Sequence, residues 1–332
     1  QRTAMKICWH IWKNKSSDSS ENKKDRRNKM LEIIKAIIYG IVEGITEWLP
    51  ISSTGHLILV ERLIPFQETS EGFFDMFDVV IQLGAILAVV VLFWNKIWPF
   101  YMKKNQQTKK GGIVRSKKDF TVGNVALSMD AFWMWVKIVV ACIPAVVYGL
   151  LFDDAVSEAF KKEIGTSGVT VQVIVVAVML VLVGVLFIVI ENWNKNRVPT
   201  TTTLSQLTYR DALIIGFCQL VAAALPGTSR SGATILGAIM IGISRTVAAE
   251  FTFFLAIPVM FGASLLKVLK FGFAFTGMEL ACLLVGTVIS FIVSLFVLRF
   301  LMGYIKKHDF KVFGWYRIVL GIIVLLYFLV FA

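Results

Sequence analysis

Long apolar runs separated by short polar segments make up most of the chain. Six of these runs approach or reach the length of about 20 residues that an α-helix needs to cross a bilayer. They cover residues 76–94, 132–152, 169–190, 249–270, 278–300 and 312–331. We therefore predict an all-α polytopic membrane protein with six transmembrane helices. The last run reaches the end of the chain, so we expect no further domain after it.

Two further apolar segments, 31–64 and 211–243, are each interrupted by a polar stretch. Pro50 and Pro226 lie in these two breaks, each followed by glycine within a few residues. Each segment therefore has an apolar arm, a break and a second apolar arm. We predict that both form re-entrant helical hairpins, which enter and leave the membrane on the same face.

Loop charges predict the orientation in the membrane. Segment 96–118 contains many Lys and Arg residues and no acid, as is typical of cytoplasmic loops. Segments 67–75 and 153–163 are acidic and lie one span away, so we expect them outside. Segments 192–210 and 306–311 then fall inside and the C-terminus outside. This assignment is consistent only if neither hairpin spans the membrane.

The two hairpins also resemble each other. An offset of 176 pairs Gly40 with Gly216, Leu49 with Leu225, Pro50 with Pro226 and Ser53 with Ser229, and an offset of 178 pairs Gly84–Ala85 with Gly262–Ala263. The first hairpin is expected to enter from outside and the second from inside. This predicts an inverted-topology repeat whose broken helices meet around a shared site. Chance similarity between two apolar segments is the alternative.

Composition changes this picture little. The net charge is +12, but the basic residues lie beside apolar segments, which indicates membrane topology rather than nucleic-acid binding. The four cysteines are scattered and form no CxxC pair, so we interpret them as packing residues. Residues 1–29 are polar and basic without a signal-peptide pattern, and we expect a disordered extension before the membrane domain 30–332.

The first polar stretch, residues 43–56, places ionisable groups at membrane depth, where they are costly unless they line a cavity. Glu43 and Glu47 are four residues apart and share one helix face. Either one carboxyl is protonated or a cation lies between them. Mg²⁺ takes carboxylate oxygens and bridges to phosphates. The alternative is a pair that caps a helix or extends to the interface.

Hydroxyls and an imidazole follow in the same stretch. Ser52, Ser53 and Thr54 come directly after the break at Pro50, where they either cap the second arm or act on a phosphate as nucleophile or donor. His56 is close to Ser53 in sequence. It is a candidate nucleophile, general base or acid for the leaving group.

The second polar stretch supplies a guanidinium. Arg230 lies between Ser229 and Ser231, and its planar fork matches the oxygens of a phosphate. The alternative is a structural ion pair with Glu43 or Glu47. The two polar stretches together contain the groups needed to bind and cleave a phosphate.

Both stretches resemble the signature motifs of a known family. Residues 43–56 have the sequence Glu-Gly-Ile-Thr-Glu-Trp-Leu-Pro-Ile-Ser-Ser-Thr-Gly-His, which resembles the first signature of the bacterial undecaprenyl-diphosphate phosphatases, the bacitracin-resistance phosphatases. Residues 226–234, Pro-Gly-Thr-Ser-Arg-Ser-Gly-Ala-Thr, resemble the second. The resemblance covers about 30–332, and the loop 101–119 is longer than the family's usual connection.

The resemblance implies an enzyme of the bacterial plasma membrane that hydrolyses undecaprenyl diphosphate, recycles this carrier for cell-wall synthesis and confers bacitracin resistance. It implies a polyprenyl diphosphate substrate within membrane lipid, no nucleic acid, a divalent cation (Mg²⁺ or Ca²⁺) and a site open to the outer face. The implied catalytic residues are Glu43, Glu47, Ser53, His56 and Arg230, with Glu43 and Glu47 also holding the cation. The implied substrate-binding residues are Ser52, Thr54, Ser229, Ser231 and Thr234.

Our interpretation is phosphoanhydride hydrolysis. Ser53, activated by Glu47 or His56, attacks the terminal phosphorus, or His56 attacks directly. A transporter or flippase of the polyprenyl phosphate carrier is the rival, because inverted repeats with broken helices are a transporter architecture. A nucleophile and an imidazole favour the enzyme, and a structural scaffold leaves the buried charges unexplained. The sequence leaves prenyl chain length and oligomeric state, including a homodimer, open.

Overall fold

The computed structural model is almost entirely helical and describes residues 25–67, 69–102, 119–122, 125–161, 163–164 and 169–331. Its helices are 25–46, α2 (Ser53–Leu63), α3 (Phe73–Ile97), α4 (Met129–Lys161), α5 (Val171–Trp193), α6 (Tyr209–Ala224), α7 (Arg230–Met240), α8 (Arg245–Phe271), α9 (Gly277–Tyr304) and α10 (Lys311–Phe331), with a 3-10 turn, η2, at Leu204–Gln206.

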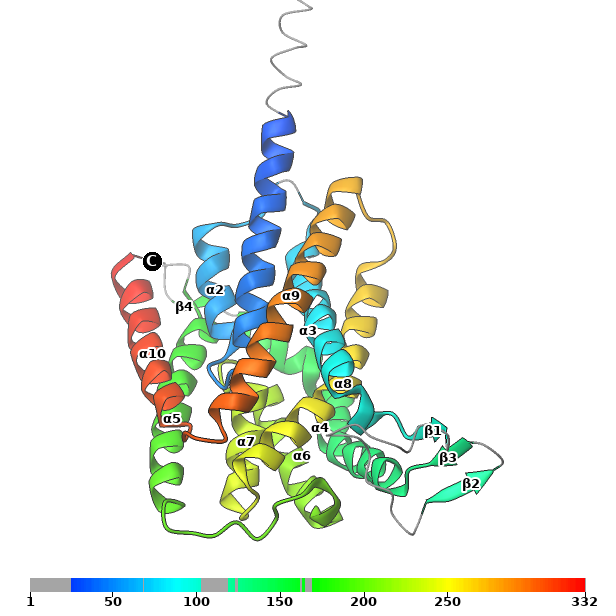
Figure 1. Ribbon diagram of the computed structural model, residues 1–332. Helices are drawn as coiled ribbons and strands as arrows, with labels where there is room; N and C mark the ends of the chain where they lie inside the picture. The colour runs from blue at the N-terminus through cyan, green and yellow to red at the C-terminus, as the bar shows by residue number, and fades with distance from the viewer. Residues whose placement is uncertain are drawn as a thin grey trace, which may run out of the picture.

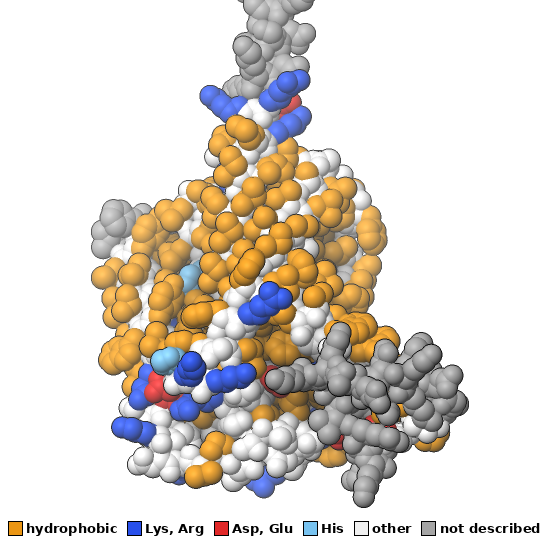
Figure 2. Space-filling view, viewed as in Figure 1, with side chains coloured by type: hydrophobic (Ala, Val, Ile, Leu, Met, Phe, Trp, Pro, Cys, Tyr) orange, Lys and Arg blue, Asp and Glu red, His pale blue; other side chains and the backbone are white. Residues whose placement is uncertain are grey.

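Six of the described helices are long and apolar enough to cross a membrane. They are α3, residues Met129–Phe152 of α4, α5, α8, α9 and Lys311–Phe328 of α10. These helices confirm the six predicted spans. Figure 2 shows apolar side chains over most of the visible face and Lys and Arg gathered mainly toward its lower part and at the start of the first helix. The chain is therefore a multi-pass membrane protein.

Two helical hairpins lie among these spans. Helix 25–46 and α2 form the first, and α6 and α7 form the second (Figure 1). The hairpins approach from opposite ends of the molecule, the first from above and the second from below in this view. This arrangement is the one expected of an inverted repeat. The position of the hairpins relative to the membrane faces stays a prediction.

The second arms of the hairpins begin in the same way. Ser52 and Ser229 are their N-caps, both have positive φ (74° and 69°), and each accepts the N–H of a glycine three residues on. The equivalent of Ser229 is thus Ser52, whereas the offset of 176 paired it with Ser53. The difference arises because the second break has one more residue between its proline and its cap than the first.

Close helix crossings hold the spans together. At Gly84 of α3, an added Cβ would lie 2.1 Å from the backbone oxygen of Thr287 in α9. Gly184 of α5 and Gly314 of α10 face each other, and a Cβ on either would lie 2.7 Å from the other's oxygen. Small residues permit such approaches, and membrane helices use them because lipid already solvates their apolar side chains.

Some segments differ from the prediction. Three short strands, β1 (Phe100–Met102), β2 (Phe120–Val122) and β3 (Val125–Leu127), form an antiparallel sheet in the order β1-β3-β2 where a loop was expected, and β4 (Glu163–Ile164) pairs with β5 (Val169–Thr170). The first helix already includes the described residues 25–29, before the expected boundary at Met30. Most of the basic loop and residues 1–24 lie outside the described residues.

Candidate active site

The breaks of the two hairpins lie side by side because Arg317 binds both. This residue of α10 is 0% exposed. Its Nη1 donates to the oxygen of Pro50 (3.3 Å), and its Nη2 donates to the oxygens of Gly227 (2.8 Å) and Thr228 (3.0 Å). A buried guanidinium is costly without such partners. The sequence analysis missed Arg317, although an arginine within an apolar span was the available signal.

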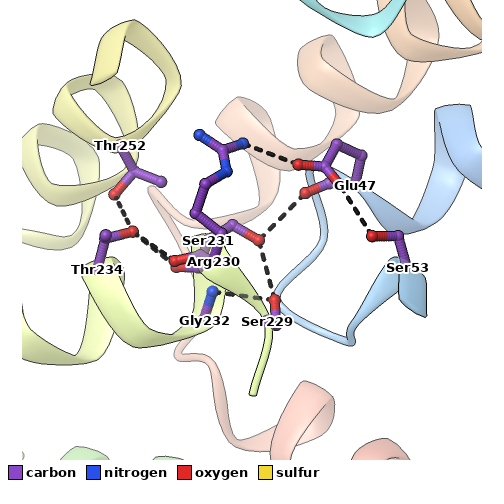
Figure 3. Close-up of polar contacts among 8 residues, drawn as sticks. All are labelled: Glu47, Ser53, Ser229, Arg230, Ser231, Gly232, Thr234 and Thr252. Carbon is purple, nitrogen blue, oxygen red and sulfur yellow. Dashed lines mark hydrogen bonds and ion pairs between the residues drawn. The ribbon is translucent and has the colours of Figure 1, made fainter. Parts of the chain in front are cut away.

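Glu47 is the centre of the site (Figure 3). Its Oε2 accepts a hydrogen bond from Ser53 Oγ (2.8 Å). Its Oε1 forms an ion pair with Arg230 Nη2 (2.8 Å). Its backbone oxygen accepts a hydrogen bond from Ser231 Oγ (3.1 Å). Residues from both predicted motifs, about 180 positions apart in the sequence, therefore meet at one carboxylate. The structure brings the predicted Glu47, Ser53, Arg230 and Ser231 together.

Two buried groups of the site have unused hydrogen-bonding capacity. Glu43 is 0% exposed, and neither of its carboxylate oxygens has a hydrogen-bond partner among the described residues. Nη1 of Arg230 also has no hydrogen-bond partner among these described residues. In Figure 3 this nitrogen extends away from Glu47. Buried charged groups of this kind are normally compensated, so the arrangement fits the binding of an anion and a cation.

His56 lies beside this cluster but does not share its hydrogen bonds. Nδ1 lies 2.7 Å from the backbone oxygen of Ser52, and Nε2 lies 2.7 Å from the hydroxyl of Tyr316 in α10. The imidazole and phenol rings are stacked, with centroids 5.6 Å apart. The hydroxyl of Ser53 therefore has Glu47, not His56, as its acceptor. Tyr316 was not among the predicted site residues.

Comparison with known proteins supports the resemblance that the two motifs indicate. The family model described as "Bacitracin resistance protein BacA" matches residues 36–323. The chain belongs to this family. It is 57% identical to the undecaprenyl-diphosphatase of Desulfitobacterium hafniense over 299 residues, which are 90% of this chain and 97% of the relative. It is 55% identical to the undecaprenyl-diphosphatase of Enterococcus faecalis over 296 residues, 89% of this chain and 97% of the relative.

The remaining predicted hydroxyls of this BacA-family chain, apart from Thr54, bind backbone groups. Ser52 and Ser229 cap α2 and α7, with Gly55 N at 3.4 Å and Gly232 N at 3.1 Å, which is the capping role left open above. Ser229 Oγ also lies 3.2 Å from Ser231 Oγ. Thr234 donates to the oxygen of Arg230 (2.8 Å) and accepts from Thr252 of α8 (2.9 Å). Thr54 lies half-buried in the first turn of α2.

The two short helices give the site its electrostatic character. Both α2 and α7 begin at the breaks, directly beside Glu47 and Arg230. The N-terminus of a helix carries unpaired N–H groups and a partial positive charge, which favour bound anions. In this BacA-family fold, two such ends and one arginine adjoin a hydroxyl and a carboxylate.

Proposed function

We infer that this chain is an undecaprenyl-diphosphatase, which hydrolyses undecaprenyl diphosphate to undecaprenyl phosphate and inorganic phosphate. The contact of Glu47 with Ser53 and Arg230 carries this inference, because it joins a base, a hydroxyl nucleophile and a phosphate-binding guanidinium. The names of the relatives supply the substrate. A transporter would need no nucleophile, so the enzyme accounts for more of the site.

In the proposed reaction, Arg230 and the N-terminal turns of α2 and α7 hold the diphosphate. Ser53 Oγ attacks the terminal phosphorus while its proton passes to Glu47 Oε2, which is already 2.8 Å away. The bond from phosphorus to the bridging oxygen breaks, and the lipid monophosphate leaves. Water then hydrolyses the phosphoserine and restores the hydroxyl. Direct attack by His56 is the alternative.

A divalent cation, Mg²⁺ or Ca²⁺, fits this site through Glu43, whose buried carboxylate oxygens have no partner within the described ranges. Glu47 is its second proposed ligand. No group of three His, Cys, Asp or Glu residues in the described part of the chain could hold a metal alone, so a cation at Glu43 and Glu47 would depend on the substrate as well. When bound, the cation neutralises charge on the diphosphate.

We place the enzyme in the bacterial plasma membrane with its site open to the outer face. The support is the charge of the loops: segment 96–118 is basic, whereas 67–75 is acidic. The isoprenoid tail would stay in the bilayer beside the apolar spans. In this position the enzyme returns the lipid carrier to cell-wall synthesis and thereby confers resistance to bacitracin.

Phosphate release tests the proposed function. Detergent-solubilised protein supplied with undecaprenyl diphosphate should release phosphate, and Glu47→Gln should abolish most of this release because glutamine cannot accept the Ser53 proton. Glu250→Gln is the matched control, since Glu250 is also buried but pairs with Lys96 at 2.7 Å, away from the breaks. Wild-type turnover in Glu47→Gln would overturn the assignment of Glu47 as the base.

A further inference from the structure

Helix α10 brings a second side chain to the site besides Arg317. The hydroxyl of its neighbour Tyr316 lies 2.7 Å from Nε2 of His56, and the two rings are almost parallel, with an interplanar angle of 6°. Tyr316 is 45% exposed, so burial does not require this contact. The reaction derived above, which rests on the proposed function, uses neither Tyr316 nor a defined state of His56.

The partners of the imidazole determine its protonation pattern. A backbone carbonyl can only accept a hydrogen bond, so the 2.7 Å contact with the oxygen of Ser52 requires the hydrogen of His56 to be on Nδ1. In the neutral ring Nε2 is then the acceptor, and the hydroxyl of Tyr316 donates to it. After protonation, Nε2–H would donate to the same hydroxyl oxygen. Tyr316 can therefore remain bound to either form.

We propose that Tyr316 is a positioning residue of the enzyme, which acts through His56. Its hydroxyl and the oxygen of Ser52 fix the ring from both nitrogens, so that His56 takes up or gives up a proton at Nε2, through the Tyr316 hydroxyl. Ser53 already has Glu47 as its proton acceptor, so His56 is available as the base for the water that hydrolyses the phosphoserine. In that step the water proton passes to the Tyr316 oxygen as the Tyr316 hydroxyl proton moves to Nε2, and the hydroxide oxygen bonds to phosphorus. The bond from phosphorus to Ser53 Oγ breaks, and Glu47 returns its proton to that oxygen.

The variant Tyr316→Phe keeps the ring and removes only the hydroxyl. The loss of a single hydrogen bond is a small part of the stability of the protein, so the variant should fold. We expect kcat to fall about 10-fold, less than the roughly 100-fold or more that a general acid or base itself contributes, because His56 is still present, while KM changes less than about twofold. Tyr304→Phe is the matched control, because Tyr304 stacks on His308 with centroids 4.6 Å apart, outside the site. An unchanged kcat in Tyr316→Phe would overturn the positioning role.

A chemical measurement tests the contact without any substrate. Diethyl pyrocarbonate modifies an imidazole nitrogen with an available lone pair, and mass spectrometry of peptides locates the adduct. We expect residue 56 to react several-fold faster in Tyr316→Phe than in the wild type and in Tyr304→Phe, with His10 as the internal reference. Equal rates at residue 56 would overturn the proposal. If the wild type released no phosphate, the proposed function would be overturned, but the modification rates would still test the contact between Tyr316 and His56.

Discussion

Arg230 uses one terminal nitrogen for Glu47, while the other has no partner in the described part of the chain. Lysine keeps the charge but cannot bind a carboxylate and a phosphate through a planar fork. We predict that Arg230→Lys lowers phosphate release on the order of 100-fold, comparable to the loss of one charge-stabilising donor. Arg299→Lys on the exposed face of α9 is the control and should retain activity. Near-normal release by Arg230→Lys would remove this arginine from the site.

The identity of the nucleophile gives a second prediction at this scale. Attack by Ser53 forms a phosphoserine, which is stable to acid, whereas attack by His56 forms an acid-labile phosphoramidate. We predict that rapid quenching with terminally labelled substrate traps an acid-stable adduct that is absent in Ser53→Ala. An acid-labile adduct that disappears in His56→Ala would identify His56 as the nucleophile instead.

Residues within the two motifs could be predicted from the sequence because their spacing is local. Glu47, Ser53 and Arg230 were found in this way, and the structure brings them together. Arg317 and Tyr316 were not, because the two adjacent residues lie in an apolar span with no neighbouring motif. Their contacts join positions more than 80 residues apart, and local spacing does not encode them.

At the scale of elements, the crossing of α3 and α9 depends on Gly84, where a Cβ would meet the oxygen of Thr287 at 2.1 Å. We predict that Gly84→Ala lowers the stability by about 1–3 kcal/mol, as overpacking does. Gly262→Ala at its repeat partner is the control, because a Cβ there would meet no neighbouring atom of the described residues within 4 Å and alanine favours helix. Thermal unfolding in detergent compares them. An equal effect of both substitutions would contradict this packing.

Element boundaries followed from the sequence where apolar runs were long. The predicted span 76–94 became α3, Phe73–Ile97, and 278–300 became α9, Gly277–Tyr304. The strands β1 to β3 were missed because three residues are too few to show an alternating pattern. The repeat register was wrong by one residue at Ser229, since a match of prolines does not report the length of the break that follows.

At the scale of the whole molecule, the loop charges predict which end faces the cytoplasm. In a background without the four native cysteines, Glu71→Cys should react with a membrane-impermeant reagent in intact cells. Ser205→Cys, in the turn η2 after α5, should react only after permeabilisation. Both positions are exposed, so accessibility to solvent does not separate them. The opposite labelling pattern would invert the orientation and contradict an outward-facing site.

The hydrogen bonds of Arg317 to both breaks can form only late in the synthesis of the chain. The ribosome synthesises the two hairpins before α10, which supplies Arg317 and Tyr316. A nascent chain that already contains both motifs therefore still lacks the link between Pro50 and Gly227. We therefore expect competence for hydrolysis only after the final helix is inserted, so that incompletely synthesised chains contribute no turnover of the carrier.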